Sequence, residues 1–279
     1  MILKKYISFM KDKSLQFINE SKQDQWIYDG DFEVTKDMVQ DGKLIKDKIP
    51  DIVNGNFDCD DNQLTSLEGG PKKVGGTFWC NRNKLTNLKG APEQVGRSFN
   101  CNSNQLTSLE GVPEKVAESF VCSYNKLTTL EGGPKEVGKH YWCNNNKLTT
   151  LEGSPVKIGE SFICDVNKLT NLEGAPVKVV GNFNCRGNQL TSLEGAPKFF
   201  NSISVNKELI IEEFFTHSKN YRSNYDKIVG SNNTRVYWEE LLKFMIEEKI
   251  DLDRVEGWPE GFLNDNVKKS AKGTLKYKL

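Results

Sequence analysis

The sequence is dominated by seven copies of a 21-residue unit that fill residues 53–198. One cysteine marks each copy, at Cys59, Cys80, Cys101, Cys122, Cys143, Cys164 and Cys185. An aromatic residue lies two positions before each cysteine and an asparagine three positions after it, followed by two leucines, a glycine and a proline in most copies. Repetition at a fixed period of roughly 20–50 residues indicates a solenoid, because one unit cannot bury its own apolar residues but stacked units share a core.

The spacing inside one copy predicts how its chain runs. In Phe78-Trp79-Cys80 the outer two side chains point to the same face of a strand, so we expect them in the core and the tryptophan outside. The following asparagine, Asn83 in this copy, is expected at a turn, where its amide can bond open backbone groups. The Gly- and Pro-containing stretch before the valine is too short for a stable helix. We therefore expect it to run extended along the other side, with the valine closing the core.

The motif Phe-x-Cys-x-x-Asn-x-Leu-Thr-x-Leu resembles the leucine-rich repeat pattern Leu-x-Leu-x-x-Asn-x-Leu. Its Leu-x-x-Leu-x-Gly-x-Pro ending is similar to the short bacterial class, known from secreted effectors and also seen in bacteriophage-encoded arrays. The resemblance covers about half of the chain, with Phe and Cys in place of the strand leucine and valine. It implies a right-handed solenoid with one parallel sheet, whose concave face is the usual partner surface.

The fold that we predict is a β-rich solenoid with a leucine-rich-repeat-like parallel sheet and helical N- and C-terminal caps. Residues 1–28 are assigned to an N-terminal helical cap and 29–205 to the solenoid. Within the solenoid, 29–52 is a degenerate repeat, 53–198 holds the seven repeats and 200–205 is a final strand, giving about nine strands. Residues 206–279 form a C-terminal helical module with a basic tail.

Both ends leave alternatives open. The amphipathic segment 2–20 reads as a cap helix, or as a membrane-surface or partner-binding helix. The tail holds five lysines and no acid, and it reads as a solvated end or as a contact for nucleic acid or an acidic partner; they are Lys268, Lys269, Lys272, Lys276 and Lys278. Nucleic acid is not otherwise expected, because 38 basic and 38 acidic residues leave no net field to attract it.

The cysteines occupy one inward position and are expected to fill the core as small apolar thiols, with a metal ladder or a disulfide chain as the alternatives. Reduced thiols fit a cytoplasmic protein, or the host cytoplasm if the chain is phage-encoded. We see no signal peptide and no run long enough to span a membrane.

Catalytic chemistry is hard to find in this sequence. Its two histidines, His140 and His217, have no neighbouring nucleophile, and no phosphate-binding glycine loop occurs. The effectors with similar repeats carry a ubiquitin-ligase domain that needs a catalytic cysteine, and here no cysteine lies outside the repeats. A recurrent glutamate column, Glu68 in the first copy, reads as solvated side chains or as a metal site. We expect no enzyme, no cofactor and no metal.

The outward strand positions vary most among the copies, and they predict the binding site. Two tryptophans with two aliphatic residues form an apolar centre with a polar border, a composition favoured at protein interfaces. The predicted partner-binding residues are Trp79, Trp142, Ile163, Val121, Tyr124, Arg82, Asn81 and Asn144.

The expected function is a non-catalytic protein-binding module that recognises its partner on the concave sheet face. The alternative is a structural or assembly protein, such as a phage virion-associated component, docking through its terminal helices. A third, weaker hypothesis is an enzyme or nucleic-acid binder built on the C-terminal module.

Overall fold

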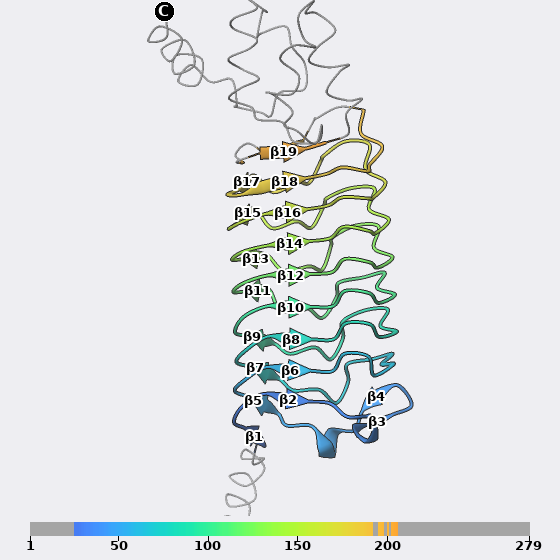
Figure 1. The fold of residues 1–279 in the computed structure, drawn as a ribbon, viewed down its shortest axis with the longest axis vertical. Coiled ribbons are helices and arrows are strands. Elements are labelled where there is room, and N and C mark those ends of the chain that lie inside the picture. The colour runs from blue at the N-terminus through green and yellow to red at the C-terminus, as the bar shows by residue number, and fades with distance from the viewer. Residues whose placement is uncertain (1–24, 192–194, 198–199, 201, 206–279) are drawn as a thin grey trace, which may run out of the picture.

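The computed structural model describes residues 25–191, 195–197, 200 and 202–205. In this part the chain is a parallel β-solenoid of stacked turns with a period of 21 residues (Figure 1). The predicted N-terminal cap helix over 2–20 and the C-terminal module 206–279 lie outside the described residues.

The predicted strands around the cysteines form one sheet of nine strands. Its members all pair in parallel, one turn to the next. They are β2 (Phe32–Glu33), β6 (Phe57–Asp58), β8 (Phe78–Trp79), β10 (Phe99–Asn100), β12 (Phe120–Val121), β14 (Tyr141–Trp142), β16 (Phe162–Ile163), β18 (Asn182–Asn184) and β19 (Ser202–Ser204).

A second parallel sheet lies on the opposite side of each turn, so the prediction of a single sheet was wrong. Its eight strands are β1 (Ile27–Tyr28), β5 (Ile52–Val53), β7 (Lys73–Val74), β9 (Gln94–Val95), β11 (Lys115–Val116), β13 (Glu136–Val137), β15 (Lys157–Ile158) and β17 (Lys178–Val179). These strands lie at the end of the Gly- and Pro-containing stretch that the sequence predicted to run extended. Because its backbone N–H and C=O groups need partners, it pairs with the same stretch of the neighbouring turn, as in Gly75 N to Val53 O at 2.8 Å.

One continuous core lies between the two sheets. It holds the aromatic residue, the cysteine and the sheet valine or isoleucine of each of the seven repeats, with both leucines of the first six, nearly all with no exposed surface. The aromatic rings form a column along the solenoid axis, stacked in pairs such as Phe57–Phe78 (centroids 5.5 Å apart) and Phe162–Phe183 (5.6 Å) and tilted or edge-on in the middle of the column. Stacking of this kind adds to the energy of apolar burial.

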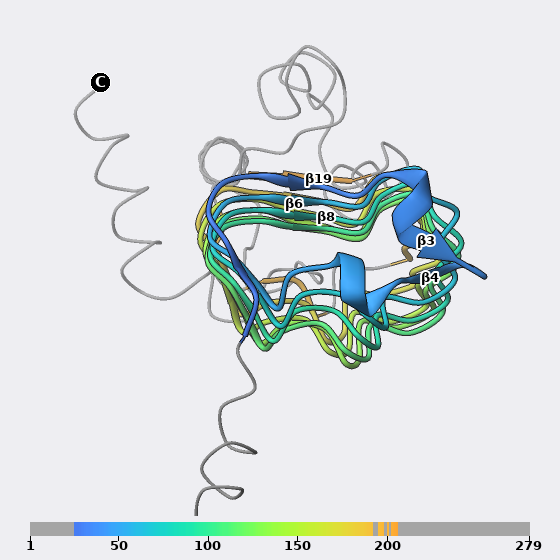
Figure 2. The ribbon, with the colours of Figure 1, turned by 90° about the horizontal axis from the view of Figure 1, so that it is seen from below.

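The turns form a straight column in Figure 1 and overlie one another in the view along the axis in Figure 2. The concave face that the family resemblance implies is therefore not seen. Sheets on both sides of every turn impose the same strand spacing of about 4.8 Å. Since neither side is splayed relative to the other, the column does not bend.

The first described turns are irregular, as expected of a terminal repeat. Two short 3₁₀ helices, η1 (Lys36–Met38) and η2 (Lys46–Lys48), flank an antiparallel hairpin of β3 (Val39–Gln40) and β4 (Lys43–Leu44). Val34 is buried at the position that a cysteine occupies later. Ile27 and Tyr28 pair with β5, so the first strand of the solenoid lies within the range 1–28 that was assigned to the cap.

An asparagine ladder ties neighbouring turns together at the corner after the nine-stranded sheet. In each of six turns the Nδ2 group donates to the cysteine carbonyl of its own turn and to that of the preceding turn. The Oδ1 atom accepts the N–H of a leucine in the preceding turn, as Asn104 does from Leu85 at 3.1 Å. The prediction that these amides satisfy turn backbone is confirmed.

The residue before each ladder asparagine adopts a left-handed conformation. This corner column has φ between 50° and 65° and consists of Asp61, Arg82, Ser103, Tyr124, Asn145, Val166 and Gly187. A β-branched residue is the least suited to that region. Val166, with φ of 52°, therefore carries backbone strain that Gly187 and Asn145 avoid.

Replacing Val166 by asparagine is expected to stabilise the protein by about 1 kcal/mol, because asparagine tolerates the left-handed region far better than valine. The side chain is 53% exposed, so little apolar burial is lost. Urea denaturation of wild type and Val166→Asn measures the difference. The matched control is Val177→Asn, which is 44% exposed and lies outside the positive-φ positions, and which should change stability by less than about 0.5 kcal/mol. A Val166→Asn protein no more stable than this control would contradict the assignment of strain.

Candidate functional site

The outer face of the nine-stranded sheet carries a column of side chains between the aromatic residue and the cysteine of each turn. We call it the sheet-face column; it consists of Asp58, Trp79, Asn100, Val121, Trp142, Ile163 and Asn184. Strand register places these residues next to one another from turn to turn, with Trp79 beside Asp58 and Trp142 between Val121 and Ile163. The predicted apolar centre is thus brought together on one face.

Exposure differs among the predicted apolar residues. Trp142 is 39% exposed, and Trp79 and Ile163 are partly exposed, which agrees with their expected outward direction. Val121 is only 9% exposed, less than expected of an outward residue, and its role in partner binding stays a prediction. It lies in register between Asn100 and Trp142 on the neighbouring strands.

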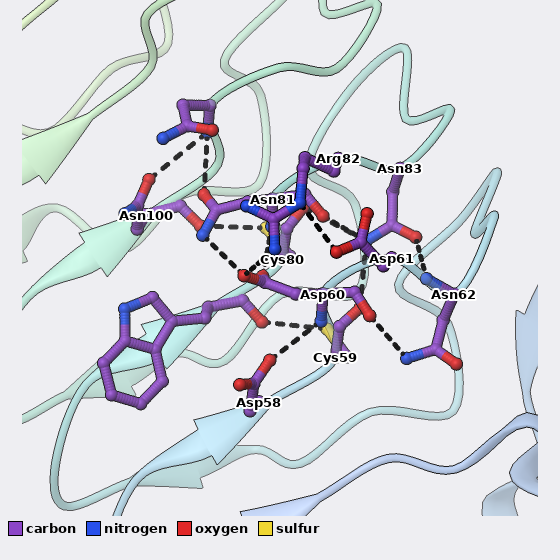
Figure 3. A network of polar contacts seen from close by, with 12 residues as sticks. Asp58, Cys59, Asp60, Asp61, Asn62, Cys80, Asn81, Arg82, Asn83 and Asn100 are labelled. Carbon is purple, nitrogen blue, oxygen red and sulfur yellow. Dashed lines mark hydrogen bonds and ion pairs between the residues drawn. The ribbon is translucent and has the colours of Figure 1, made fainter.

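A second, polar column follows the cysteines, and it is more buried than the sequence suggested. Asn81 is 4% exposed, less than expected of a residue on the open face, and its role in partner binding stays a prediction. The amide is used inside the solenoid, because its Nδ2 donates to Asp60 Oδ2 at 2.9 Å and its Oδ1 accepts from Asn102 N at 3.1 Å (Figure 3). Asn144, in the same column, is partly exposed and accepts a hydrogen bond from Ser123 Oγ at 2.5 Å.

The corner column supplies the remaining predicted residues. Tyr124 is 58% exposed, more than any other large hydrophobic residue near the sheet-face column. Arg82 is exposed and pairs with two acids of the preceding turn, its Nε lying 2.6 Å from Asp61 Oδ2 and its guanidinium 3.6 Å from Asp60 Oδ2 (Figure 3). Both side chains are therefore accessible, and the Arg82 guanidinium is already partnered within the chain.

His140 also contributes to this face, although the sequence indicated no function for it. The ring centroid of His140 lies 5.7 Å from that of Trp142, and its Nε2 lies 2.8 Å from Glu160 Oε2. His140 Nδ1 also accepts the N–H of Ser161 at 3.4 Å. The sequence signal for this position of His140 is that it lies two residues before an outward tryptophan. Its contact with Glu160 could not be predicted from local sequence, because Glu160 is 20 residues away, in the next turn.

Asp165, in the polar column of the same face, has a carboxyl group with a raised pKa. Its Oδ1 accepts the N–H of Arg186 at 3.0 Å and its Oδ2 accepts from Asn184 Nδ2 at 2.8 Å. Burial raises the pKa of this carboxyl to about 6, against the smaller opposing effects of the Arg186 backbone and charge. The folded state therefore holds the proton more tightly than the unfolded chain, and the charged carboxylate destabilises the fold at neutral pH.

This carboxyl predicts a pH-dependent effect of Asp165→Asn. Because the folded pKa lies above the unfolded value near 3.8, the contribution of Asp165 to stability is greatest below pH 4 and is lost as the pH rises to about 6. Asparagine already occupies the equivalent position at Asn81, Asn102 and Asn144. Asp165→Asn should thus be more stable than wild type at pH 7.5, with a gap that shrinks towards pH 4. Urea titrations across this range measure the gap, and a constant difference would contradict the assignment.

The thiols lie away from this face. All seven are free and fully buried, as the spacing predicted, and six donate to a main-chain carbonyl of the next turn. Burial raises the pKa of the Cys101 thiol well above its usual value, and it does the same at the other six cysteines. A buried thiol that stays protonated is a poor nucleophile, so this ladder is a structural element of the core.

No protein-family model, curated protein or solved structure matches the chain. Its class is therefore stated from the structure, as a repeating parallel β-solenoid. Within residues 25–205, as far as they are described, no group of three His, Cys, Asp or Glu side chains is placed to hold a metal ion. No helix in the described part of the chain is long and apolar enough to cross a membrane.

Proposed function

We propose that the chain is a non-catalytic binding module of the leucine-rich repeat type that recognises a protein partner with the outer face of its nine-stranded sheet. The observation that carries the proposal is the exposed Trp142 in register with Ile163, three turns along from the partly exposed Trp79. A tryptophan on the solvent face of a sheet leaves apolar area in water, and such residues are the commonest anchors of protein interfaces.

The surroundings of the anchors support a protein partner. Tyr124, Asn144 and Arg82 supply a polar and aromatic border around the apolar centre, the arrangement of core and rim that protein interfaces use. The short strands hold these side chains on a rigid scaffold, so binding would cost little ordering entropy. We place this activity in the cytoplasm, where the buried thiols would stay reduced.

The alternative is a structural or assembly role, such as in a phage virion, through the terminal segments. Those segments lie outside the described residues, and nothing on the solenoid favours this role over binding by the sheet face.

Affinity capture from lysate of the native host tests the proposal. Wild type is compared with Trp79→Ala/Trp142→Ala and with the control Val156→Ala/Val177→Ala, which removes two exposed apolar side chains at the opposite sheet. Circular dichroism verifies that all three are folded. The proposal expects a partner that wild type and the control retain and that the tryptophan variant loses. Equal capture by all three proteins would refute it and direct attention to the terminal segments.

A further inference from the structure

An acid lies in the surroundings of each tryptophan of the sheet-face column. Asp58 is the register partner of Trp79 on the neighbouring strand. At the other end, Glu160 reaches the surroundings of Trp142 through His140, whose ring lies against the indole and whose Nε2 contacts the carboxylate at 2.8 Å. The face thus presents two aromatic rings, one with an acid in register beside it and one with an acid that is connected to it through a histidine.

In the described part of the chain, neither acid forms an ion pair with a lysine or an arginine. Arg82 forms ion pairs with Asp60 and Asp61 and is also attracted by Asp58, so one cation faces three acids at this end of the column. Glu160 is paired only with His140 among the ion pairs of the described residues, and its carboxylate is about half exposed. The two positions therefore keep negative potential on an accessible surface.

An aromatic face next to a carboxylate is a site for a cationic side chain. The ring quadrupole attracts a guanidinium or ammonium group within about 6 Å of its centroid, and the carboxylate adds a Coulombic term. Arginine suits such a site better than lysine, because its planar group stacks on the ring while it donates to the acid.

The distance between the two positions restricts the shape of the ligand. Trp79 and Trp142 are three turns apart in the register that runs through Asn100 and Val121. At about 4.8 Å per strand the separation is roughly 14 Å. An extended chain advances about 3.3 Å per residue and points every second side chain to the same face, so residues i and i+4 lie about 13 Å apart on one side.

From this geometry we propose that the partner presents a basic extended segment, in which two cationic side chains four residues apart dock on Trp79 with Asp58 and on Trp142 with Glu160. The segment lies along the sheet-face column, across the strands, over Asn100 and the buried Val121. This inference rests on the proposed function, for which it names the chemistry of the partner. Charge complementarity of this kind sets specificity and association rate.

Synthetic peptides test the inference on the full-length protein. The probe is a short, fluorescently labelled, acetylated and amidated peptide of serine and threonine with arginine at i and i+4. One comparison peptide has arginine at i and i+3, which puts the cations on opposite faces, and another has neutral citrulline in both positions. At low ionic strength we expect the first peptide to bind at least about tenfold more tightly than either comparison peptide, by fluorescence anisotropy. Equal binding of the citrulline peptide, or no binding of the i, i+4 peptide, would overturn the inference.

Charge-only variants assign the binding to these two positions. Asp58→Asn/Glu160→Gln keeps the shapes and the acceptor that Asp60 N uses at 2.9 Å, and it should weaken binding of the i, i+4 peptide by about tenfold. The control Glu114→Gln/Glu136→Gln removes two exposed acids near the eight-stranded sheet and should leave the affinity unchanged. An equal loss in both variants would show a general charge effect and contradict the two sites.

The two proposals fail separately. A captured partner that needs Trp79 and Trp142 but binds Asp58→Asn/Glu160→Gln as tightly as wild type leaves the binding module standing and refutes the basic segment. A partner that binds Trp79→Ala/Trp142→Ala as tightly as wild type refutes the binding module itself.

Discussion

Asn104→Ala is expected to destabilise the protein by about 3–5 kcal/mol, although it removes a small polar side chain. The amide donates to Cys80 O at 2.9 Å and to Cys101 O at 3.1 Å, and it accepts from Leu85 N at 3.1 Å. Asn104 is 8% exposed, so water cannot replace these partners without opening the corner. Each buried backbone group left without a partner costs about 1–3 kcal/mol.

The neighbouring substitution Gln105→Ala provides the control. Gln105 is exposed, and its side-chain Oε1 accepts one surface hydrogen bond from Lys126 Nζ at 3.1 Å. It should change stability by less than about 0.5 kcal/mol. Urea denaturation followed by circular dichroism gives both values. If Asn104→Ala were no more harmful than Gln105→Ala, the ladder would not hold the turns together.

Gly153→Ala is expected to be similarly harmful, with a loss of about 3 kcal/mol or more. The residue has φ of 91°, where an L side chain is strained. A Cβ atom would lie 2.3 Å from Leu130 C and 2.4 Å from Glu131 N, both in the backbone of the preceding turn. Because no side-chain rotation relieves a contact with backbone, the turns would have to separate locally.

Gly187→Ala isolates the conformational part of that cost. Gly187 also has a positive φ, of 65°, but its added Cβ would meet the Val166 residue at 3.2 Å or more, and other residues occupy this corner column in other turns. We expect a loss of about 1 kcal/mol from the left-handed backbone alone. Thermal or urea denaturation of both variants separates strain from overlap, and equal losses would show that the turns are not packed as closely as the glycine requires.

The local structure of one turn could be predicted because each of its features depends on residues close in sequence. The two-residue spacing of Phe78 and Cys80 fixed their common direction, and the position of Asn83 after the strand indicated its role at the corner. The relation between turns was harder to predict. Lys73 and Val74 form a strand only because the same dipeptide position lies one turn above and below.

The candidate site was predictable in direction but not in exposure. Trp142 points outward, as the strand alternation required. Whether an outward residue is covered depends on the residues 21 positions before and after it, as Asp60 and Asn102 show at the buried Asn81. Inside the core, too, a side chain lies close to the backbone of a neighbouring turn. The buried Tyr141 hydroxyl, which has no oxygen or nitrogen partner, lies close enough to Gly133 for an added Cβ there to meet it at 3.1 Å.

Isothermal titration of the purified, captured partner against the full-length chain tests the central claim most directly. Wild type and Val156→Ala/Val177→Ala should bind with affinities within about twofold of each other. Trp79→Ala/Trp142→Ala should bind at least about a hundredfold more weakly, since an interface anchor typically contributes 2 kcal/mol or more. The same affinity for all three proteins would contradict binding by the sheet face.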